Sequence, residues 1–293
     1  RSDRITMRSS SAPGCTDADA GRDGDTENGT DTDGHAYTAP QPMLRLERCS
    51  AAYDTLRVFE DLSLEVAPAE VVAVVGRSGC GKTTLVHVAA ALTLPTAGQV
   101  SLDGRPLAAG DHRVGFVQQH YGLFPWFTAG GNVELGLRLR GVGRDERRRR
   151  AMQALDELGL ADAAARFPGE LSGGEQQRVA LARTTALEPE VLLLDEPFSS
   201  LDAFTREALQ EDLLRLQGLH RRATLLVTHS LEEAVFTADR IGIMYGSPAA
   251  LSVHENPWRT PRSQRSHADR STEAFSTAVA TLRGSFEELS DGT

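Results

Sequence analysis

The sequence predicts an α/β protein built on a mainly parallel β-sheet. Four short apolar runs, at residues 71–75, 191–194, 224–227 and 241–244, have the length and composition of strands that are covered on both faces. Between them, residues 82–92 are predicted to be helical, and residues 205–219 carry apolar side chains at helical spacing. Strands that alternate with helices pack as a parallel sheet with helices on both faces.

Further elements extend this outline along the chain. Residues 44–46 and 62–66 alternate apolar and polar side chains, which predicts half-exposed antiparallel strands. Residues 125–168 are predicted to be helical, although Gly130 and Gly131 interrupt what should be the start of a helix. The sequence Ser-Leu-Glu-Glu at 230–233 is a capping box that opens another helix. One more helix is expected near residues 272–289.

Composition divides the chain into three parts. Residues 1–42 are predicted to be a disordered acidic tail, because they carry eight acids against four arginines and nearly lack large apolar residues. Residues 43–250 are predicted to form the folded domain, with a helical subdomain at about 125–175. Residues 251–293 are polar and arginine-rich and are predicted to be a partly helical C-terminal extension.

Charge and apolar content exclude several classes of protein. The net charge of −10 argues against nonspecific nucleic-acid binding, so the arginines at 144 and 147–150 are interpreted as a solvated helix face. No signal peptide is visible, and the longest apolar stretch, 86–94, is about half of the ~20 residues that a membrane helix needs. Three scattered cysteines favour a reducing cytosol over a disulfide framework or a zinc site. Any membrane role would therefore depend on partner subunits.

The only lysine in the chain, among 30 arginines, stands in a phosphate-binding loop pattern. The pattern G-x-x-x-x-G-K-[ST] is formed by Gly76, Arg77, Ser78, Gly79, Cys80, Gly81, Lys82 and Thr83. A predicted strand precedes it and a predicted helix follows, so backbone N–H groups and the helix dipole converge on phosphate. Lys82 is expected to neutralise the β- and γ-phosphates and Thr83 to bind Mg²⁺, with Thr84 also in the nucleotide-binding set. Cys80 is interpreted as a small filler at a tight turn, with a redox switch as the alternative.

Two acids follow the buried strand at 191–194. A carboxylate at this edge of a parallel sheet points into the crevice where ligands bind. Asp195 is therefore expected to hold Mg²⁺, and Glu196 to act as a general base on the attacking water. The alternative is that they are ordinary charges at the start of a helix.

A second anion-binding helix end is predicted at Leu-Ser-Gly-Gly-Glu-Gln-Gln-Arg, residues 171–178. Ser172, Gly173 and Gly174 open a helix that runs through residue 182. One phosphate loop with two phosphate-cradling helix ends is most simply explained by two copies that face head to tail. Each ATP site would then take Lys82 from one chain and Ser172 from the other.

These motifs, in this order, resemble the nucleotide-binding subunit of an ABC transporter over about residues 43–250. The resemblance implies a P-loop NTPase core with a mainly parallel sheet, an antiparallel β subdomain and an α-helical subdomain. It also implies an ATPase that binds ATP and Mg²⁺, pairs with a second ATPase subunit and drives transmembrane permease subunits from the cytoplasmic face of the membrane.

The resemblance also assigns roles to individual residues. Tyr53 would stack on adenine, unless it is an ordinary core or surface tyrosine. Gln119 would sense Mg²⁺ and the attacking water, with Gln118 as the adjacent competitor. Asp202 would lie in a loop that crosses the dimer interface, and His229 would contact the γ-phosphate.

The same comparison of motifs predicts a weakness in the dimer. Glu175 stands where glutamine is common in the family, close to the ATP held by the facing subunit. Its extra negative charge is expected to weaken dimer closure.

The aromatic cluster at 121–127 is a candidate docking surface for the permease, with core packing as the alternative. This stretch and the C-terminal residues look most like importers of nitrate, sulfonates and taurine, whose permeases work with an extracytoplasmic solute-binding protein. A homodimer is expected, although a pair of different chains and the direction of transport stay open. The alternatives are another small solute, an ABC ATPase without a membrane partner, or a stand-alone kinase or GTPase, against which residues 171–178 argue.

Overall fold

The computed structural model describes residues 42–291, which belong to one compact unit of the chain. The predicted acidic tail therefore lies, except for residue 42, outside the described residues. Within residues 42–291, no helix combines the length and the apolar character that crossing a membrane requires.

Ten strands form one continuous sheet in the described part of the chain. Their order across the sheet is β5-β4-β1-β2-β10-β9-β3-β8-β7-β6. The neighbours from β9 to β6 are parallel, whereas β1, β2, β4 and β5 pair in antiparallel fashion. The strands are β1 Leu44–Tyr53, β2 Leu56–Val66, β3 Val71–Gly76, β4 Ala97–Leu102, β5 Arg105–Pro106, β6 Val114–Val117, β7 Val191–Asp195, β8 Ala223–Thr228, β9 Arg240–Gly246 and β10 Ala249–Glu255.

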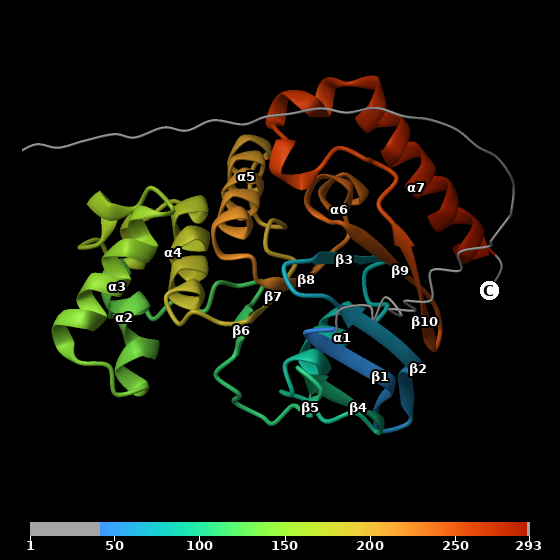
Figure 1. Cartoon of the computed structure of the whole chain (residues 1–293), viewed down its shortest axis with the longest axis horizontal. Helices are drawn as coiled ribbons and strands as arrows, with labels where there is room; N and C mark the ends of the chain where they lie inside the picture. Colours follow the sequence, from blue (N-terminus) through green and yellow to red (C-terminus); the bar gives the residue numbers. More distant parts are fainter. Residues whose placement is uncertain (1–41, 292–293) are drawn as a thin grey trace, which may run out of the picture. The chain divides into compact units, whose positions relative to one another are not determined.

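The helices are grouped by the face of the sheet that they cover. Figure 1 shows α1 on the side of the antiparallel strands, and α5, α6 and α7 on the opposite side. Helices α2, α3 and α4 contact one another and form the predicted helical subdomain. The helices are α1 Lys82–Ala89, α2 Ala129–Leu139, α3 Arg144–Asp156, α4 Gly173–Thr185, α5 Ala203–His220, α6 Leu231–Thr237 and α7 Glu273–Asp291, with short 3₁₀ turns η1 Ala161–Ala163, η2 Pro168–Glu170, η3 Arg262–Gln264 and η4 His267–Ser271.

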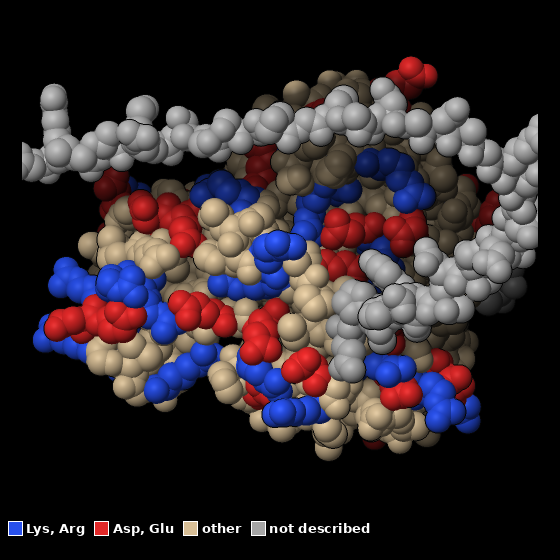
Figure 2. Space-filling model, in the orientation of Figure 1, with Lys and Arg blue, Asp and Glu red and all other residues tan. Residues whose placement is uncertain are grey.

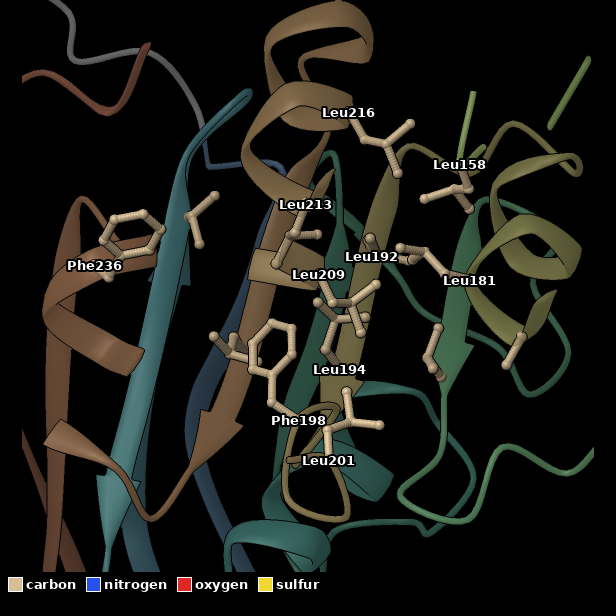
Figure 3. Close-up of a cluster of buried hydrophobic side chains, with 14 of the residues drawn as sticks. Leu158, Leu181, Leu192, Leu194, Phe198, Leu201, Leu209, Leu213, Leu216 and Phe236 are labelled. Carbon is tan, nitrogen blue, oxygen red and sulfur yellow. The ribbon is translucent and has the colours of Figure 1, made fainter. Parts of the chain in front are cut away.

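Two hydrophobic cores lie on the two faces of the sheet. Strand β3 sends alternate side chains to each, because Val72 and Val74 join one cluster, and Val71, Ala73 and Val75 join the other. The first cluster contains α1 and the antiparallel strands. The second contains the helical subdomain and helices α5 to α7, and Figure 3 shows part of it between β7, α4 and α5. Burial on both faces is the reason that the four apolar runs are continuous, and the predicted α/β class with an antiparallel β subdomain is confirmed.

Two local predictions about helix ends were wrong. Helix α1 ends at Ala89 instead of continuing to residue 92, because Ala91 takes a left-handed φ of 53° and turns the chain out of the helix. Gly130 and Gly131 do not interrupt a helix start but form the first turn of α2, where Thr128 Oγ1 accepts from the Gly131 N–H over 3.1 Å.

The capping box predicted at 230–233 is only half formed. Ser230 Oγ accepts from the Glu233 N–H over 3.2 Å, as expected. The Glu233 carboxylate, however, binds the hydroxyl of Thr228, and the Ser230 N–H donates to that same hydroxyl over 3.1 Å. The buried hydroxyl of Thr228 has therefore taken the place of the Ser230 N–H as the partner of the Glu233 carboxylate.

The run of arginines on α3 is interleaved with acids. Arg147 pairs with Glu134 at 2.9 Å, Arg149 with Glu146 at 2.7 Å, and Arg150 with Glu188 at 2.9 Å. The face in Figure 2 shows blue and red side chains alternating over this region. Such pairing favours the predicted solvated helix face over a surface for nucleic acid.

The C-terminal residues are more tightly integrated than the sequence suggested. The predicted end of the folded domain, at residue 250, falls inside strand β10. This strand pairs with β9 along its length and with β2 at one position. The predicted helix near 272–289 is present as α7 and packs against α6 and β9.

Candidate functional site

A polar hollow surrounds the glycine-rich loop between β3 and α1, at the carboxyl edge of the parallel strands. Its volume is about 380 Å³. Parallel sheets bind ligands at this edge, and a lining of backbone N–H groups, hydroxyls and one cation suits a phosphate chain. The lining residues are Ser78, Gly79, Gly81, Lys82, Thr83, Thr84, Gln119 and Glu196.

Lys82 is the cation of this hollow. The residue is only 5% exposed, and its Nζ donates to the carbonyl oxygens of Gly76 at 3.0 Å and Arg77 at 3.1 Å. The same Nζ lies 3.6 Å from Glu196 Oε1. Gly81, next to it, has a φ of 106°, a conformation that side-chain-bearing residues rarely adopt. The loop therefore holds one compact ammonium in a fixed place.

Three residues of the predicted loop, Gly76, Arg77 and Cys80, line no part of this hollow. Arg77 and Cys80 border a separate cavity of about 350 Å³ beside β9. Burial raises the pKa of the Cys80 thiol. A half-buried thiol that stays neutral is a poor nucleophile, which favours the predicted filler over a redox switch.

Thr83 and Asp195 bring two oxygen ligands together. Thr83 Oγ1 donates to Asp195 Oδ1 over 3.4 Å, and Asp195 is 4% exposed. Burial raises the pKa of Asp195, because its charged form loses hydration. A divalent cation would offset that loss, and Mg²⁺ takes hydroxyl and carboxylate oxygens together with water and phosphate. The two residues therefore fit the predicted metal.

Glu196 lies at the centre of the charged groups. Its backbone has a left-handed φ of 44°, which costs a non-glycine residue about 1 kcal/mol or more and is common at functional sites. Its Oε2 lies 3.2 Å from His229 Nδ1, while its Oε1 faces Lys82. The strained backbone thus presents one carboxylate to both a lysine and a histidine, although the sequence had separated Glu196 from His229 by 33 residues.

The structure distinguishes the two candidate glutamines by where they lie. Gln119 lines the polar hollow, and its Nε2 donates to Ser199 Oγ over 3.5 Å. Gln118 lines a different groove, between β6, α2 and α4. This placement favours Gln119 for contact with nucleotide and Mg²⁺.

The second predicted anion-binding helix end does not line the hollow of its own chain. Ser172 Oγ caps α4 by accepting from the Glu175 N–H over 3.3 Å, and Glu175 Oε2 accepts from the Ser172 N–H over 2.8 Å. Gly174 is required by close packing, because a Cβ there would lie 2.2 Å from Thr205 Cγ2. Residues 172–175 are absent from the lining of the hollow. Within one chain, the Ser172 helix end and the polar hollow therefore do not form a single site.

Two predicted contacts lie at the surface. Tyr53 ends β1 and is 50% exposed, which excludes a core tyrosine and leaves its ring accessible for stacking. Asp202 is exposed and caps α5 by accepting from the Thr205 N–H over 3.1 Å. Hydrogen bonds to Thr205 hold the pKa of Asp202 below its ordinary value, so it stays charged.

Two structural residues near the site were missed by the sequence interpretation. Asn132 is fully buried in α2, and its amide bonds the backbone of the aromatic stretch at Phe124, Phe127 and Thr128. Arg183 of α4 donates to the carbonyls of residues 121 and 122. Nothing in the sequence distinguished these side chains from ordinary surface groups, because their partners are backbone atoms of a distant loop.

A groove of about 440 Å³ adjoins this loop. Its lining combines apolar side chains with Gln118 and Arg183, and includes Phe116, Phe124, Leu135, Leu139 and Leu187. Trp126 packs against Phe124 with ring centroids 5.6 Å apart and is 67% exposed. The core-packing alternative for the aromatic cluster is thus excluded for Trp126.

Comparisons with known proteins agree with this geometry. The profile of the family described as "ABC transporter" matches residues 59–199. An aliphatic sulfonates import ATP-binding protein of Xanthomonas axonopodis pv. citri is 42% identical over 223 residues, or 75% of this chain and 87% of its own length. A taurine import ATP-binding protein of Mesorhizobium japonicum is 43% identical over 252 residues, or 85% of this chain and 96% of its own length.

Solved structures give the same result. The dimeric ATP-binding cassette MJ0796, bound to ADP and Pi in a post-hydrolysis state, matches with a TM-score of 0.65 and 31% identity, over 73% of this chain and 98% of its own. The cbiO1 subunit of an ABC transporter complex from Clostridium perfringens matches with a TM-score of 0.68 and 25% identity, over 74% of this chain and 89% of its own. With its nucleotide hollow, its separate helix end and these relatives, the chain belongs to the ABC transporter family, as an ATP-hydrolysing subunit.

Proposed function

We propose that this chain hydrolyses MgATP as one half of a head-to-tail homodimer at the cytoplasmic face of a membrane, and thereby drives solute import through permease subunits. The main observation behind the proposal is that the predicted nucleotide-binding residues lie in two separate places on one chain. Lys82, Asp195 and Glu196 gather at one edge of the sheet, while the Ser172 helix end opens elsewhere on the same chain. A second copy would supply the missing half to each hollow.

The side chains have distinct tasks in this proposal. Lys82, with the loop N–H groups, binds the β- and γ-phosphates, and Tyr53 stacks on the adenine ring. Thr83, Asp195 and Gln119 would hold Mg²⁺, which neutralises phosphate charge when it is bound. Glu196 accepts a proton from the attacking water, and His229, 3.2 Å from it, orients that carboxylate.

The groove beside α2 and α4 is proposed as the permease contact. Most of its lining side chains are apolar, it adjoins the exposed Trp126, and Arg183 bonds the backbone of the stretch that follows Gln119. A membrane subunit bound in this groove would move together with the loop that contains Gln119, which we propose contacts the nucleotide. An ABC ATPase without a membrane partner would have no need of this exposed aromatic surface, which favours the transporter.

The relatives suggest the solute. Those at 42–43% identity are named for taurine and for aliphatic sulfonates. We therefore propose an organic sulfonate, delivered to the permease by an extracytoplasmic binding protein, in place of the broader nitrate, sulfonate and taurine group. The ATPase would not touch the solute itself.

Replacing Glu196 with glutamine tests the proposal. Glu196→Gln is expected to bind MgATP without hydrolysing it and to accumulate as a dimer, because the amide keeps the shape of the site but accepts no proton. Size-exclusion chromatography with light scattering checks the mass with and without MgATP. A variant that stays monomeric in saturating MgATP, while the unaltered chain hydrolyses ATP as a monomer, contradicts the dimer.

The same variant tests the solute in the native host. Strains that carry Glu196→Gln are expected to lose growth on taurine as sole sulfur source and to keep growth on sulfate. Normal growth on taurine, together with a trapped dimer, would exclude taurine as the solute, and normal growth on aliphatic sulfonates as well would refute the sulfonate assignment and leave the ATPase intact.

Replacing Glu175 with glutamine tests the predicted weakness of the dimer. Hydrogen bonds from Ser172 hold the pKa of Glu175 below its ordinary value, so the carboxylate is charged, and Arg166, 3.5 Å away, and Arg178 offset part of that charge. Glutamine can keep the cap while removing the charge. Glu175→Gln is expected to raise ATP hydrolysis about two- to threefold, in line with the size of a helix-terminus charge effect. An unchanged or lower rate in a phosphate-release assay rejects the idea.

A further inference from the structure

One buried acid has no part in the chemistry proposed above. Glu233 lies in the first turn of α6 and is 6% exposed, although acids are rarely buried without a partner. One carboxylate oxygen binds the Thr228 hydroxyl, and the other lies 3.7 Å from Arg206 Nε. Glu233 therefore joins a residue of β8 to a residue of α5.

Arg206 holds the other end of this connection. From the first turn of α5 it donates to the carbonyl of Leu201 over 2.7 Å and of Phe198 over 3.4 Å. These carbonyls border Ser199 and Ser200, whose hydroxyls meet Gln119 at 3.5 Å and Tyr121 at 2.5 Å. One guanidinium thus fixes the path of the segment 198–201, which runs from Glu196 toward Asp202.

Thr228 fixes the residue that follows it. Its hydroxyl donates to Glu233 and accepts from the Ser230 N–H over 3.1 Å, so both neighbours of His229 are tied down. Thr228 is 1% exposed, whereas the His229 side chain is 53% exposed and contacts Glu196. The direction of the imidazole is therefore set by backbone that Glu233 anchors.

The C-terminal segment keeps α5 and α6 together around this pair. Arg265 donates through Nη1 to the carbonyls of Val235, Phe236 and Ala238 at the end of α6. Arg270 stacks over the Phe236 ring at 3.8 Å and bonds Gln210 of α5. The distance between Arg206 and Glu233 is thus held by packing that extends well beyond them.

We propose that Arg206 and Glu233 are positioning residues for ATP hydrolysis, because they connect the segment 198–202 to the backbone around His229. Contact of Asp202 with a second copy would then change the orientation of the His229 side chain. This step rests on the proposed dimer. Burial raises the pKa of Glu233, and the hydrogen bond from Thr228 and the charges of Arg206 and Arg270 oppose this effect. Loss of Arg206 would leave Glu233 buried without its charged partner, and loss of the Glu233 charge would release the half-exposed Arg206.

Glu233→Gln keeps the size of the side chain and removes its charge. We expect kcat for ATP hydrolysis to fall about tenfold or more while KM for ATP changes by less than about twofold, because the nucleotide-binding groups are untouched. Arg206→Gln should show the same pattern. The double variant should lose no more than the larger single loss, because one connection is broken in each case. Thermal melting with and without MgATP checks that each variant folds.

A matched control removes a similar pair from another place. Glu70→Gln breaks a partly buried pair with Arg240 at 3.1 Å, at the opposite edge of the sheet, and is expected to keep kcat. If Glu233→Gln does not fold, Arg206→Lys, which keeps the charge, is expected to recover most of the activity that Arg206→Gln loses.

Three results would overturn the proposal. They are an unchanged kcat in folded Glu233→Gln, losses that multiply in the double variant, or an equal loss in Glu70→Gln. None of these outcomes affects the trapping of the Glu196→Gln dimer, so failure of this inference and failure of the proposed function are separable.

Discussion

Mixing two inactive variants is expected to restore ATP hydrolysis. A Lys82→Ala chain lacks the phosphate-binding ammonium, and a Ser172→Arg chain blocks the helix end that would face the partner's nucleotide. Each alone should lose about 100-fold or more in hydrolysis, the usual effect of removing a charge-stabilising group at a reacting phosphate. Together they form one dimer in which Lys82 and Ser172 from different chains meet in an intact site.

The expected yield follows from symmetry. Random pairing of equal amounts gives half mixed dimers, and each mixed dimer carries one intact and one doubly altered site. The mixture should therefore recover about a quarter of the unaltered activity if each site hydrolyses ATP independently. It should recover less if hydrolysis requires both sites of a dimer to be intact. Activity is measured as phosphate release at fixed total protein over a series of mixing ratios, and should peak at equal amounts.

The control places both changes in one chain. A Lys82→Ala/Ser172→Arg chain mixed with either single variant cannot assemble an intact site, and should stay inactive. Ser172 lies on the capping turn of α4, so ATP binding to Ser172→Arg alone reports whether its own hollow is preserved. No recovery in the mixture, with both variants folded and Ser172→Arg still binding ATP, would show that sites are not shared between chains.

Much of the site could be predicted because it depends on local sequence. The strand, loop and helix around Lys82 are contiguous, and their order alone fixes where the ammonium lies. Asp195 and Glu196 follow a continuous apolar strand, so their place at the edge of the sheet was also predictable. The register of the parallel strands then brings His229, just after β8, to Glu196, just after β7.

What could not be predicted depends on partners far apart in the chain. The choice of Gln119 over the adjacent Gln118 came only from the family resemblance, because the residues alone do not show that the turn after β6 sends Gln119 to the hollow. Glu233 was taken for half of a capping box, because its bond to Thr228 and its approach to Arg206 have no sequence signature. The end of α1 was also misjudged, because Ala91 adopts a left-handed conformation that alanine seldom takes.

Replacing Lys82 with arginine is expected to abolish function although charge is kept. The ammonium fits between the carbonyls of Gly76 and Arg77, at 3.0 and 3.1 Å, in a position that is 5% exposed. A guanidinium is longer and planar, and its fork cannot occupy the space of a point charge between two phosphates. We expect ATP hydrolysis to fall about 100-fold or more, with ATP binding also weakened.

Because the chain has a single lysine, chemical labelling can test independently whether Lys82 lies at the bound nucleotide. Lys82 is the only lysine, so an amine-reactive ATP analogue has one side-chain target in the whole protein. Mass spectrometry should find a single modified lysine, blocked by excess ATP and absent from Lys82→Arg. All 30 other Lys or Arg positions of the chain carry arginine, so no second lysine side chain competes for the reagent. A Lys82→Arg chain that hydrolyses ATP at the normal rate would mean that the ammonium is not required there, and that phosphate is bound elsewhere.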